Sequence, residues 1–540
     1  MDAMVPYAHT SALKACGHRL KWCHNKAMPG SPTRAAIAGS SRPTVEAGAR
    51  IARLGGNAVD IAVAAALTAT ASEILQCSLG GSGFVMLHLD GAAPELIEGA
   101  DAMPGLQRRH ALGQQNWRRV HVPYGEGLEF MVGHGTVAVP GLLAALELAW
   151  QRHGTLPWAE IVAPVVELTR TGWPMAPASA TWLDICGLQV FGHQVASRDS
   201  FFTDGVHARA GEMTTIPGLD GTMEAIAREG ARAFYEGDLA RAFAAEMAAH
   251  DAPLTRADLS AYRAQVRAPL RLSSAGFVMA LNPPPAIGGA AVGSLIGLLD
   301  MAWRPEDAHE ARVLSCARAQ KYVLGLRAET FASEGFDDAR ARALIAPDTL
   351  RRHHEALRSP HTTHLSVATE NGGLVAITMS LGYGAGVTIP GTGIACNNSL
   401  GEKELNPRGF FAIAPGQRLV SNMAPTVAWH PDGRCIAMGS PGASRITTAI
   451  AQTWQRFAFE GATFAEAVAA PRLHVENRES GFHVQHEPGL DVTRLQPEFT
   501  VHAFPGRHLY FGGTHVAGRD RHGRLHAIAD DRRDGQTALV

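Results

Sequence analysis

The chain has 540 residues, 46% of them hydrophobic, and a formal net charge of −2 at pH 7. This is the composition of a soluble globular protein, and the length would accommodate several domains. The near-neutral charge gives no reason to expect nucleic acid or an anionic membrane surface as a partner.

Residues 1–34 carry several basic side chains but lack the apolar core of a signal peptide. We therefore expect a loose N-terminal tail and a cytoplasmic protein. Two long uncharged stretches, 272–299 and 371–401, are broken by prolines and glycines, so neither is expected to cross a membrane as a helix. Both are predicted to be buried strands and loops of a large core.

Helical patterns dominate the chain before residue 362, and strand patterns follow it. Helices are predicted from 42 to the Gly55-Gly56 pair and over 60–72, 142–152, 158–169, 223–250 with a break near Gly237, 308–329 and 339–358, with a strand over 84–89. Strands are then predicted over 427–429 and 435–438, and helices over 444–459 and 462–469. The charged run 519–534 is expected to be solvated surface.

This order of elements predicts a layered fold of mixed helices and strands (α/β or α+β). The pattern alone does not distinguish one parallel sheet from two stacked antiparallel sheets.

Thr362 begins a predicted hairpin, in which two apolar runs flank the turn Glu370-Asn371-Gly372-Gly373. A threonine within a chain is a poor nucleophile. If the peptide bond before it is cut, its new α-amine lies beside its own Oγ and can act as the general base. Spacing alone supports this weakly, because threonine is common in strands.

The surrounding motifs make the sequence resemble the γ-glutamyltransferase family, from about residue 35 to 474. The matching segments are Thr362-Thr363-His364-x-Ser366, Gly391-Thr392-Gly393-Ile394, Asn397-Asn398, Ser421-Asn422-Met423-Ala424-Pro425-Thr426 and Gly439-Ser440-Pro441-Gly442-Ala443-Ser444-Arg445, preceded by Gly55-Gly56-Asn57-Ala58-Val59-Asp60, Gly80-Gly81-Ser82-Gly83-Phe84, Val139-Pro140-Gly141, Phe234-Tyr235-Glu236-Gly237 and Pro283-Pro284-Pro285. Each motif is weak alone, but this many in order are specific.

The resemblance implies an N-terminal-nucleophile (Ntn) hydrolase with a four-layer αββα sandwich. Such proteins are made as one precursor that cuts itself before the threonine, here between His361 and Thr362. Residues 35–361 and 362–540 would then form a large and a small subunit that together build one domain. The expected assembly is a heterodimer of the two fragments, with a higher oligomer left open.

The resemblance also assigns roles within the site. Thr362 is the nucleophile, the backbone N–H groups of Gly442 and Ala443 stabilise the oxyanion, and Thr363 and Ser380 hydrogen-bond the nucleophile. Substrate contacts are expected from Ser421, Asn422, Ser399 and Glu402, of which Glu402 would meet an ammonium group. Ala443, Ser380 and Asn422 stand where the family generally has glycine, threonine and serine.

Substrate recognition departs further from the family. Ala100 falls where γ-glutamyl enzymes carry an arginine that grips the glutamyl α-carboxylate. Arg108 and Arg109 are interpreted as surface ion-pairing residues rather than replacements. Losing a charged hydrogen bond costs about 1.5–3 kcal/mol. The segment 398–421 is also short for the family, which predicts a more open pocket. We infer an acyl group other than an ordinary γ-glutamyl unit.

The predicted function is therefore an autoprocessing N-terminal-threonine amidohydrolase that cleaves a small amide or N-acyl bond. Two alternatives stay open: a true γ-glutamyltransferase or glutathione hydrolase, and an uncleaved, inert binding protein. No cofactor or metal is predicted, and the metal-binding motif HExxH is absent. A serine hydrolase is not expected either, because GxSxG is absent and Ser11-Ala12-Leu13-Lys14 lacks a KTG partner. His361 and His364 are three apart on a predicted strand and so point to opposite faces.

Seven cysteines without a CxxC pair argue against a disulfide framework and favour free or buried thiols. They are Cys16, Cys23, Cys77, Cys186, Cys316, Cys396 and Cys435.

Overall fold

The computed structural model describes residues 30–89, 91–114, 116–122, 128–326, 336–346, 362–442, 445–478 and 480–540. Most of the predicted tail, the cleavage-site residue His361, the oxyanion candidate Ala443, and Cys16 and Cys23 lie outside these residues.

Two antiparallel sheets form the centre of the molecule. The first has the order β22 (Gln536–Leu539), β1 (Ala35–Gly39), β11 (Thr363–Thr369), β12 (Leu374–Ser380), β2 (Ser82–His88), β3 (Glu95–Gly99) and β8 (Gln265–Arg267). The second has the order β21 (Leu525–Ile528), β20 (His515–Arg519), β16 (Cys435–Gly439), β15 (Thr426–Trp429), β10 (Phe277–Leu281) and β9 (Leu270–Ser274). The alternative that the sequence left open is thus decided in favour of stacked antiparallel sheets.

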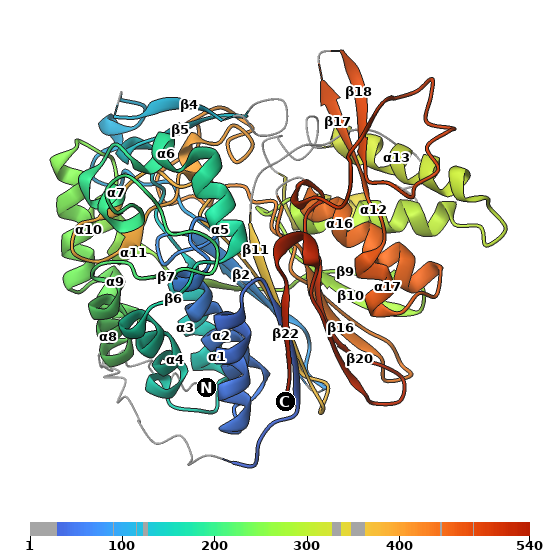
Figure 1. Ribbon diagram of the computed structural model, residues 1–540, viewed down its shortest axis with the longest axis horizontal. Helices are drawn as coiled ribbons and strands as arrows, with labels where there is room; N and C mark the ends of the chain where they lie inside the picture. The colour runs from blue at the N-terminus through green and yellow to red at the C-terminus, as the bar shows by residue number, and fades with distance from the viewer. Residues whose placement is uncertain are drawn as a thin grey trace, which may run out of the picture.

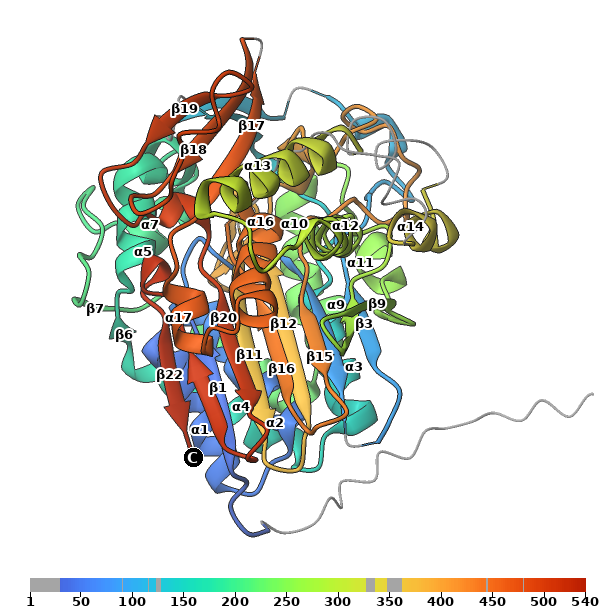
Figure 2. The same cartoon turned by 90° about the vertical axis from the view of Figure 1, so that its right-hand side faces the viewer.

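Helices cover the outer face of each sheet, which gives the predicted four layers (Figure 1). On the first sheet lie α1 (Arg42–Arg53), α2 (Ala58–Ser72) and α3 (Leu142–His153), with α4 (Trp158–Thr171) behind them. On the second lie α12 (Gly288–Ala302), α16 (Arg445–Trp454) and α17 (Phe464–Ala469), with α13 (His309–Leu326) packed on α12. Figure 2 shows this second sheet behind its helices.

Smaller elements extend the helical layer of the first sheet and the far end of the second. They are α5 (Pro177–Trp182), α6 (Leu188–Phe191), α7 (Val195–Phe201), α8 (Leu219–Glu229), α9 (Arg232–Tyr235), α10 (Asp238–Ala249), α11 (Arg256–Ala261), α14 (Asp338–Leu344), and the short pairs β4 (Arg118–Val122) with β5 (Leu128–Val132), β6 (Trp173–Pro174) with β7 (Met213–Thr214), β13 (Thr388–Ile389) with β14 (Ile394–Ala395), and β17 (Leu473–Arg478), β18 (Gly481–His486) with β19 (Thr500–Ala503).

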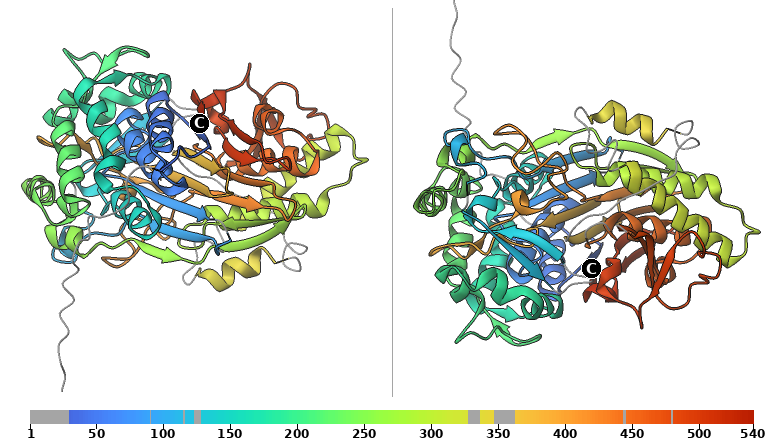
Figure 3. Two further views of the ribbon diagram at one scale, coloured as in Figure 1. Left: turned by 90° about the horizontal axis from the view of Figure 1, so that it is seen from below. Right: turned by 90° about the horizontal axis from the view of Figure 1, so that it is seen from above.

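The core follows these layers. Along β11, Leu365 and Val367 point into the cluster beneath α1 and α2, whereas Ala368 belongs to the cluster between the sheets. This alternation has the two-residue period of a strand buried on both faces. The layer between the sheets is built largely from small residues, which brings the sheets close together (Figure 3).

His364 and Ser366 of β11 face the second sheet and are hydrogen-bonded to each other. His364 bonds Thr378 through Nδ1 and Ser366 through Nε2, both at 2.9 Å. Burial lowers the pKa of His364 well below its usual value, so the ring is neutral. A Cβ at Gly439 would lie 2.4 Å from this ring, which explains the glycine that starts the motif Gly439 to Arg445. His364 is therefore a structural residue.

Most predicted elements before residue 327 are confirmed, and two predictions were wrong in part. The stretch 272–299 contains strands and loops, but from Gly288 it forms the helix α12. The four glycines and three alanines of this helix let it pack tightly on its neighbours. In 339–358, α14 ends at Leu344 and the residues after 346 lie outside the described part. Among the described residues, no helix is long and apolar enough to cross a membrane.

The prediction that the run 519–534 is solvated surface was also wrong in part. The turn after β20 is exposed, but Asp530, Arg532 and Arg533 are buried. Asp530 accepts from Arg472 at 2.6 Å and from Arg532 at 3.1 Å. Arg532 also pairs with Glu487. Mutual pairing keeps these charges inside the protein, and single-sequence charge patterns do not reveal such partners. The five described cysteines are free and buried, as predicted.

Asp530→Asn is expected to destabilise the protein by about 3–5 kcal/mol, because Arg472 then remains buried without its carboxylate. The matched control is Asp432→Asn, at a surface turn, with an expected cost below about 1 kcal/mol. Denaturant unfolding of both purified variants measures the difference. Equal stabilities would contradict the account of this buried ion network.

Candidate active site

One pocket brings together six of the predicted site residues. It has a volume of about 410 Å³, part of it open to solvent. Its described lining is Ser82, Ala100, Asp101, Thr362, Ser380, Ser399, Glu402, Leu405, Leu419, Val420, Ser421, Asn422 and Met423. We call it the acyl pocket. The predicted Thr363 lies beside it on β11, and the predicted Gly442 lies on the loop after β16.

Thr362 occupies the last position before β11, and its residue is 4% exposed. The next residue, Thr363, anchors the start of β11. Thr363 Oγ1 donates to Glu73 Oε2 at 2.5 Å and lies 3.0 Å from Ser40 Oγ. These contacts fix the start of β11 between the end of β1 and the end of α2. A direct bond from Thr363 to the nucleophile stays a prediction.

The contacts of Thr363 continue as a directed chain of hydrogen bonds. The backbone N–H of Asp530 donates to His515 Nδ1 at 3.2 Å, so the ring proton resides on Nε2, 2.9 Å from Ser40 Oγ. Burial lowers the pKa of His515 to about 4 and raises that of Glu73. The order of donation is therefore His515 to Ser40 to Thr363 to Glu73.

Sequence reasoning did not find Ser40, Glu73 or His515. One signal was available for Glu73, because it is the single Asp, Glu, Lys or Arg between Asp60 and Asp90 in an otherwise apolar stretch. A lone charge that follows a buried helix requires a partner. No comparable signal marks Ser40 or His515.

Two buried carboxyl groups form the acidic side of the acyl pocket. Ser399 Oγ donates to Asp101 Oδ2 at 2.6 Å, and burial raises the pKa of Asp101 to about 7. Burial, with the nearby Glu404 and Asp101, also raises the pKa of Glu402 well above its usual value. No side chain in the described part of the chain donates a hydrogen bond to Glu402. Burial thus favours the neutral form of both carboxyl groups, and a cation that enters the pocket would favour their ionised forms.

Gly382 makes room for this acidic side. Its φ of +67° suits glycine, and a Cβ there would lie 2.0 Å from Glu402 Oε1 and 2.5 Å from Asn398 Oδ1. Asp101 was absent from the sequence-predicted set, although it follows Ala100 directly.

No arginine side chain lines the acyl pocket among the described residues. Ala100 does line it. Arg108 pairs with Asp251 at 3.0 Å, as expected for a surface ion pair. Arg418 lies 3.3 Å from Glu98 and stacks on Tyr262, with its guanidinium carbon 4.1 Å from the ring centre. The described lining of the pocket thus includes carboxyl groups and no cation that could bind an α-carboxylate.

Ser380, Ser421 and Asn422 complete the wall through local bonds. Ser380 Oγ accepts from the backbone N–H of Gly382 at 3.0 Å, and Ser421 Oγ accepts from that of Met423 at 3.2 Å. The backbone of Ser421 also accepts from Ile287, at the end of the triple-proline segment. These bonds fix the conformations of segments 380–382 and 421–423, which form part of the pocket wall.

Gly442 has a φ of +115°, in the region that favours glycine. A Cβ there would lie 2.7 Å from the Cα of Gly512. The loop is thus fixed against the turn before β20. Gly442 does not line the acyl pocket, but Arg533, whose Nη2 would lie 3.3 Å from that Cβ, lines a second pocket with Thr362.

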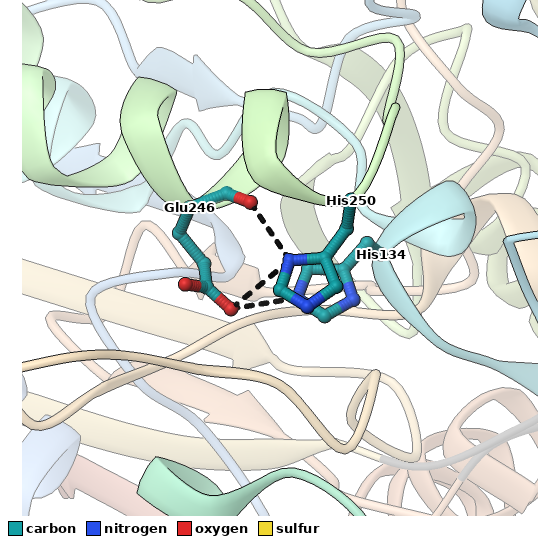
Figure 4. Close-up of side chains that lie close together, drawn as sticks. All are labelled: His134, Glu246 and His250. Atoms are coloured by element: carbon teal, nitrogen blue, oxygen red, sulfur yellow. Dashed lines mark hydrogen bonds and ion pairs between the residues drawn. The ribbon is translucent and has the colours of Figure 1, made fainter.

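One group of three potential metal ligands occurs among the described residues, at the end of α10 (Figure 4). His134 Nε2 lies 2.8 Å from Glu246 Oε1, and His250 Nδ1 bonds the backbone oxygen of Glu246 at 3.0 Å. The two rings are stacked with centroids 3.7 Å apart and planes 7° apart, and one ligand atom from each of the three residues lies within 4.8 Å of the others. The hydrogen bond from His134 to Glu246 joins the turn after β5 to the end of α10.

The model of the γ-glutamyltranspeptidase (γ-glutamyltransferase) family matches residues 44–540, and the chain belongs to this family. It is therefore an enzyme of the self-processing Ntn class, an amide hydrolase or acyltransferase.

Similar proteins include the acylase ACY 1 proenzyme of Pseudomonas sp. (strain SE83), 30% identical over 489 residues, which cover 84% of each chain. The glutathione hydrolase proenzyme of Escherichia coli (strain K12) is 27% identical over 476 residues, covering 81% of this chain and 80% of that protein. The fold is similar to a crystal structure of cephalosporin acylase from Bacillus halodurans, with a TM-score of 0.74, 23% identity and 99% of both chains covered.

Gly442→Ala is expected to lower kcat by about 10²–10³-fold, the cost of misplacing one oxyanion donor. Gly433→Ala is the matched control, because Gly433 also has positive φ (+90°) but has no atom within 4 Å of an added Cβ. Its kcat should change less than about threefold. Comparable losses in both variants would mean that backbone strain, rather than the position of the loop beside Gly512, decides activity.

Proposed function

We propose that this protein is an N-terminal-threonine amidohydrolase that cuts itself before Thr362 and removes a small acyl group bearing an ammonium but no neighbouring carboxylate. The observation that carries the proposal is the acyl pocket, where Thr362 shares its walls with buried Asp101 and Glu402 and with Ala100. The expected mature form is a heterodimer of the two fragments.

Maturation would begin with attack of Thr362 Oγ on the carbonyl carbon of His361. The His361–Thr362 peptide bond is replaced by an ester, and water opens the ester to give fragments of 361 and 179 residues. The freed α-amine then takes the proton from Thr362 Oγ as this atom attacks a substrate amide. Donors on the loop of Gly442 would stabilise the oxyanion, and water would resolve the acyl-enzyme.

Charge supports the choice of acyl group. A glutamyl α-carboxylate in this pocket would meet Asp101 and Glu402 without an arginine to neutralise it. The corresponding 4-aminobutanoyl group keeps the ammonium and omits that carboxylate. A γ-glutamyltransferase or glutathione hydrolase remains the second candidate, since the similar protein of E. coli is a glutathione hydrolase proenzyme.

Self-cleavage is tested by intact mass. The wild-type protein is expected to separate into fragments of 361 and 179 residues under denaturing conditions. Thr362→Ala, which lacks the nucleophile, should remain one chain, whereas Thr362→Ser retains a hydroxyl and should still be cut. A wild-type protein that stays full-length would contradict cleavage before Thr362.

Four p-nitroanilides of one chain length test the acyl group: γ-glutamyl, 4-aminobutanoyl, glutaryl and butanoyl. They carry both charges, the ammonium alone, the carboxylate alone, or neither. The 4-aminobutanoyl compound should have the highest kcat/KM, about 10–100-fold above butanoyl, the effect of one charged hydrogen bond. Glu402→Gln should reduce this ratio and leave butanoyl unchanged. A wild-type preference for γ-glutamyl would contradict the proposal.

The preference for the ammonium should rise with pH. Asp101 has a raised pKa of about 7, so it is protonated below that pH and ionised above it. The ratio of kcat/KM for 4-aminobutanoyl over butanoyl is therefore expected to increase between pH 5.5 and 8.5. Titration of the threonine amine affects both substrates and cancels in the ratio. A ratio that is flat or falls over this range would exclude Asp101 as a contact of the ammonium.

A further inference from the structure

His134, Glu246 and His250 form a compact group outside the two pockets that Thr362 lines (Figure 4). We call it the histidine cluster. One ligand atom from each residue lies within 4.8 Å of the other two. Two imidazoles and a carboxylate are the protein ligands of a well-known type of zinc site, in which zinc has four ligands in a tetrahedron. The histidine cluster therefore has the chemistry of a zinc site.

The backbone places the three side chains on facing segments. Glu246 and His250 are four positions apart at the end of α10, so they project from the same face of this helix. This is the spacing of the two zinc ligands in an HExxH helix. His134 comes from the turn His134–Thr136 after β5, 112 positions before Glu246. The carbonyl groups at the end of a helix carry partial negative charge, which favours a cation there.

Two of the three ligands are already held in place. The side chains of His134 and Glu246 are each 11% exposed, and Glu246 Oε1 lies 2.8 Å from His134 Nε2. The same oxygen accepts from Gln194 Nε2 at 2.6 Å and lies 3.5 Å from His250 Nδ1. Ligand atoms at about 2.0–2.1 Å from a tetrahedral zinc ion are about 3.3 Å from one another. The distances from Glu246 Oε1 to the two imidazole nitrogens lie on either side of this value.

One ring has to turn for a metal ion to bind. An imidazole binds a metal close to its own plane, whereas the two rings are stacked with planes 7° apart and centroids 3.7 Å apart. His250 is the ring that can turn, because its side chain is 46% exposed. Turning gives up the hydrogen bond of its Nδ1 to the backbone oxygen of Glu246. The exposure of His250 also gives water access as a fourth ligand.

Asn116 lies beside the histidine cluster and has an unused acceptor. Its backbone oxygen accepts from Gly135, which follows His134, and its Nδ2 donates to the backbone oxygen of Asp251, which follows His250. Its Oδ1 is buried and has no hydrogen-bond partner in the described part of the chain. A buried oxygen without a donor costs free energy. A metal-bound water is a donor of the kind that this oxygen lacks.

We propose that His134, Glu246 and His250 form a binding site for Zn²⁺, with water as the fourth ligand. The ion joins the turn after β5 to the end of α10. None of the three residues lines the acyl pocket, so the site takes no part in the amide chemistry.

The expected role of the ion is to stabilise the fold. The turn that carries His134 also holds the segment after Gly382, because the N–H of Gly133 donates to the backbone oxygen of Ala385 at 2.7 Å. A ligand that binds only the folded chain raises the free energy of unfolding. Zinc should therefore raise the melting temperature of the protein.

Zinc binding is measured by calorimetry and thermal unfolding on the full-length, tag-free protein after treatment with a chelator. The wild-type melting temperature is expected to rise by about 2–5 °C in about 100 µM ZnCl₂. Residues 1–29 also carry three histidines and two cysteines, which are zinc-ligand residue types. The site is therefore identified by differences between variants. No substrate is used, so the result does not depend on the amidohydrolase function.

His250→Ala is expected to lower the zinc stoichiometry by one and to remove the zinc-dependent rise in melting temperature. Because His250 is exposed, the zinc-free variant should melt within about 1 °C of the zinc-free wild type. Glu246→Gln should weaken zinc binding by about tenfold or more, since loss of an outer-shell partner alone costs 10–100-fold. Co²⁺ bound in place of zinc should show the visible absorption of a tetrahedral ion in the wild type and lose it in His250→Ala.

His526→Ala is the matched control. His526 Nε2 lies 3.1 Å from Asp520 Oδ2, but no third ligand residue completes this pair in the described part of the chain. Its zinc binding should equal that of the wild type. Unchanged stoichiometry in His250→Ala and Glu246→Gln, or a wild-type melting temperature that does not respond to zinc, would overturn the assignment. An equal loss in His526→Ala would also overturn it, because zinc would then bind loosely to surface histidines.

Discussion

The hydrogen bond from Thr363 to Glu73 is the constraint on which the site depends. It joins the first residue of the central hairpin to the end of α2, and Ser40 and His515 extend it to β1 and to the second sheet. Ser40 and Glu73 precede the predicted cleavage site in the chain, whereas Thr363 and His515 follow it. Because each donor has a buried acceptor, the chain of bonds has one arrangement of low energy. The residue before this anchored strand, Thr362, is thereby held at the junction of two pockets.

The two pockets differ in charge, and this difference gives the proposed specificity a physical basis. Asp101 and Glu402 make one side acidic, while Arg533 and the amide of Gln76 lie on the other. Gly382 belongs to the second pocket and lies against Glu402, so the absence of its Cβ shapes both. In the proposed function, these charges would orient a bound amide at Thr362 before any bond forms, and such positioning lowers a barrier. Ala100 stands where the family resemblance leads us to expect an arginine, so it also leaves the acyl pocket without a positive charge for a carboxylate.

Local features were predictable from the sequence, and distant partners were not. The hairpin, the apolar helix 60–72 and the ordered motifs depend on residues close in the chain, so their patterns predicted β11, β12 and α2. The contacts of Thr363 with Ser40 and of Asp101 with Ser399 join residues 323 and 298 positions apart. Nothing in the local sequence encodes them. The buried Arg532 was misjudged for the same reason, because its partner Glu487 lies 45 residues away.

The most direct measurement is to locate the acyl group on the enzyme during turnover. The p-nitrophenyl ester of butanoate has no amine that could displace p-nitrophenolate, and it acylates rapidly, so the acyl-enzyme should accumulate in a burst and survive an acid quench. Peptide mapping by mass spectrometry is predicted to find it as an ester on Thr362, in a peptide whose free N-terminus is that threonine. An acyl group on another residue, or on a chain still joined to His361, would contradict the account.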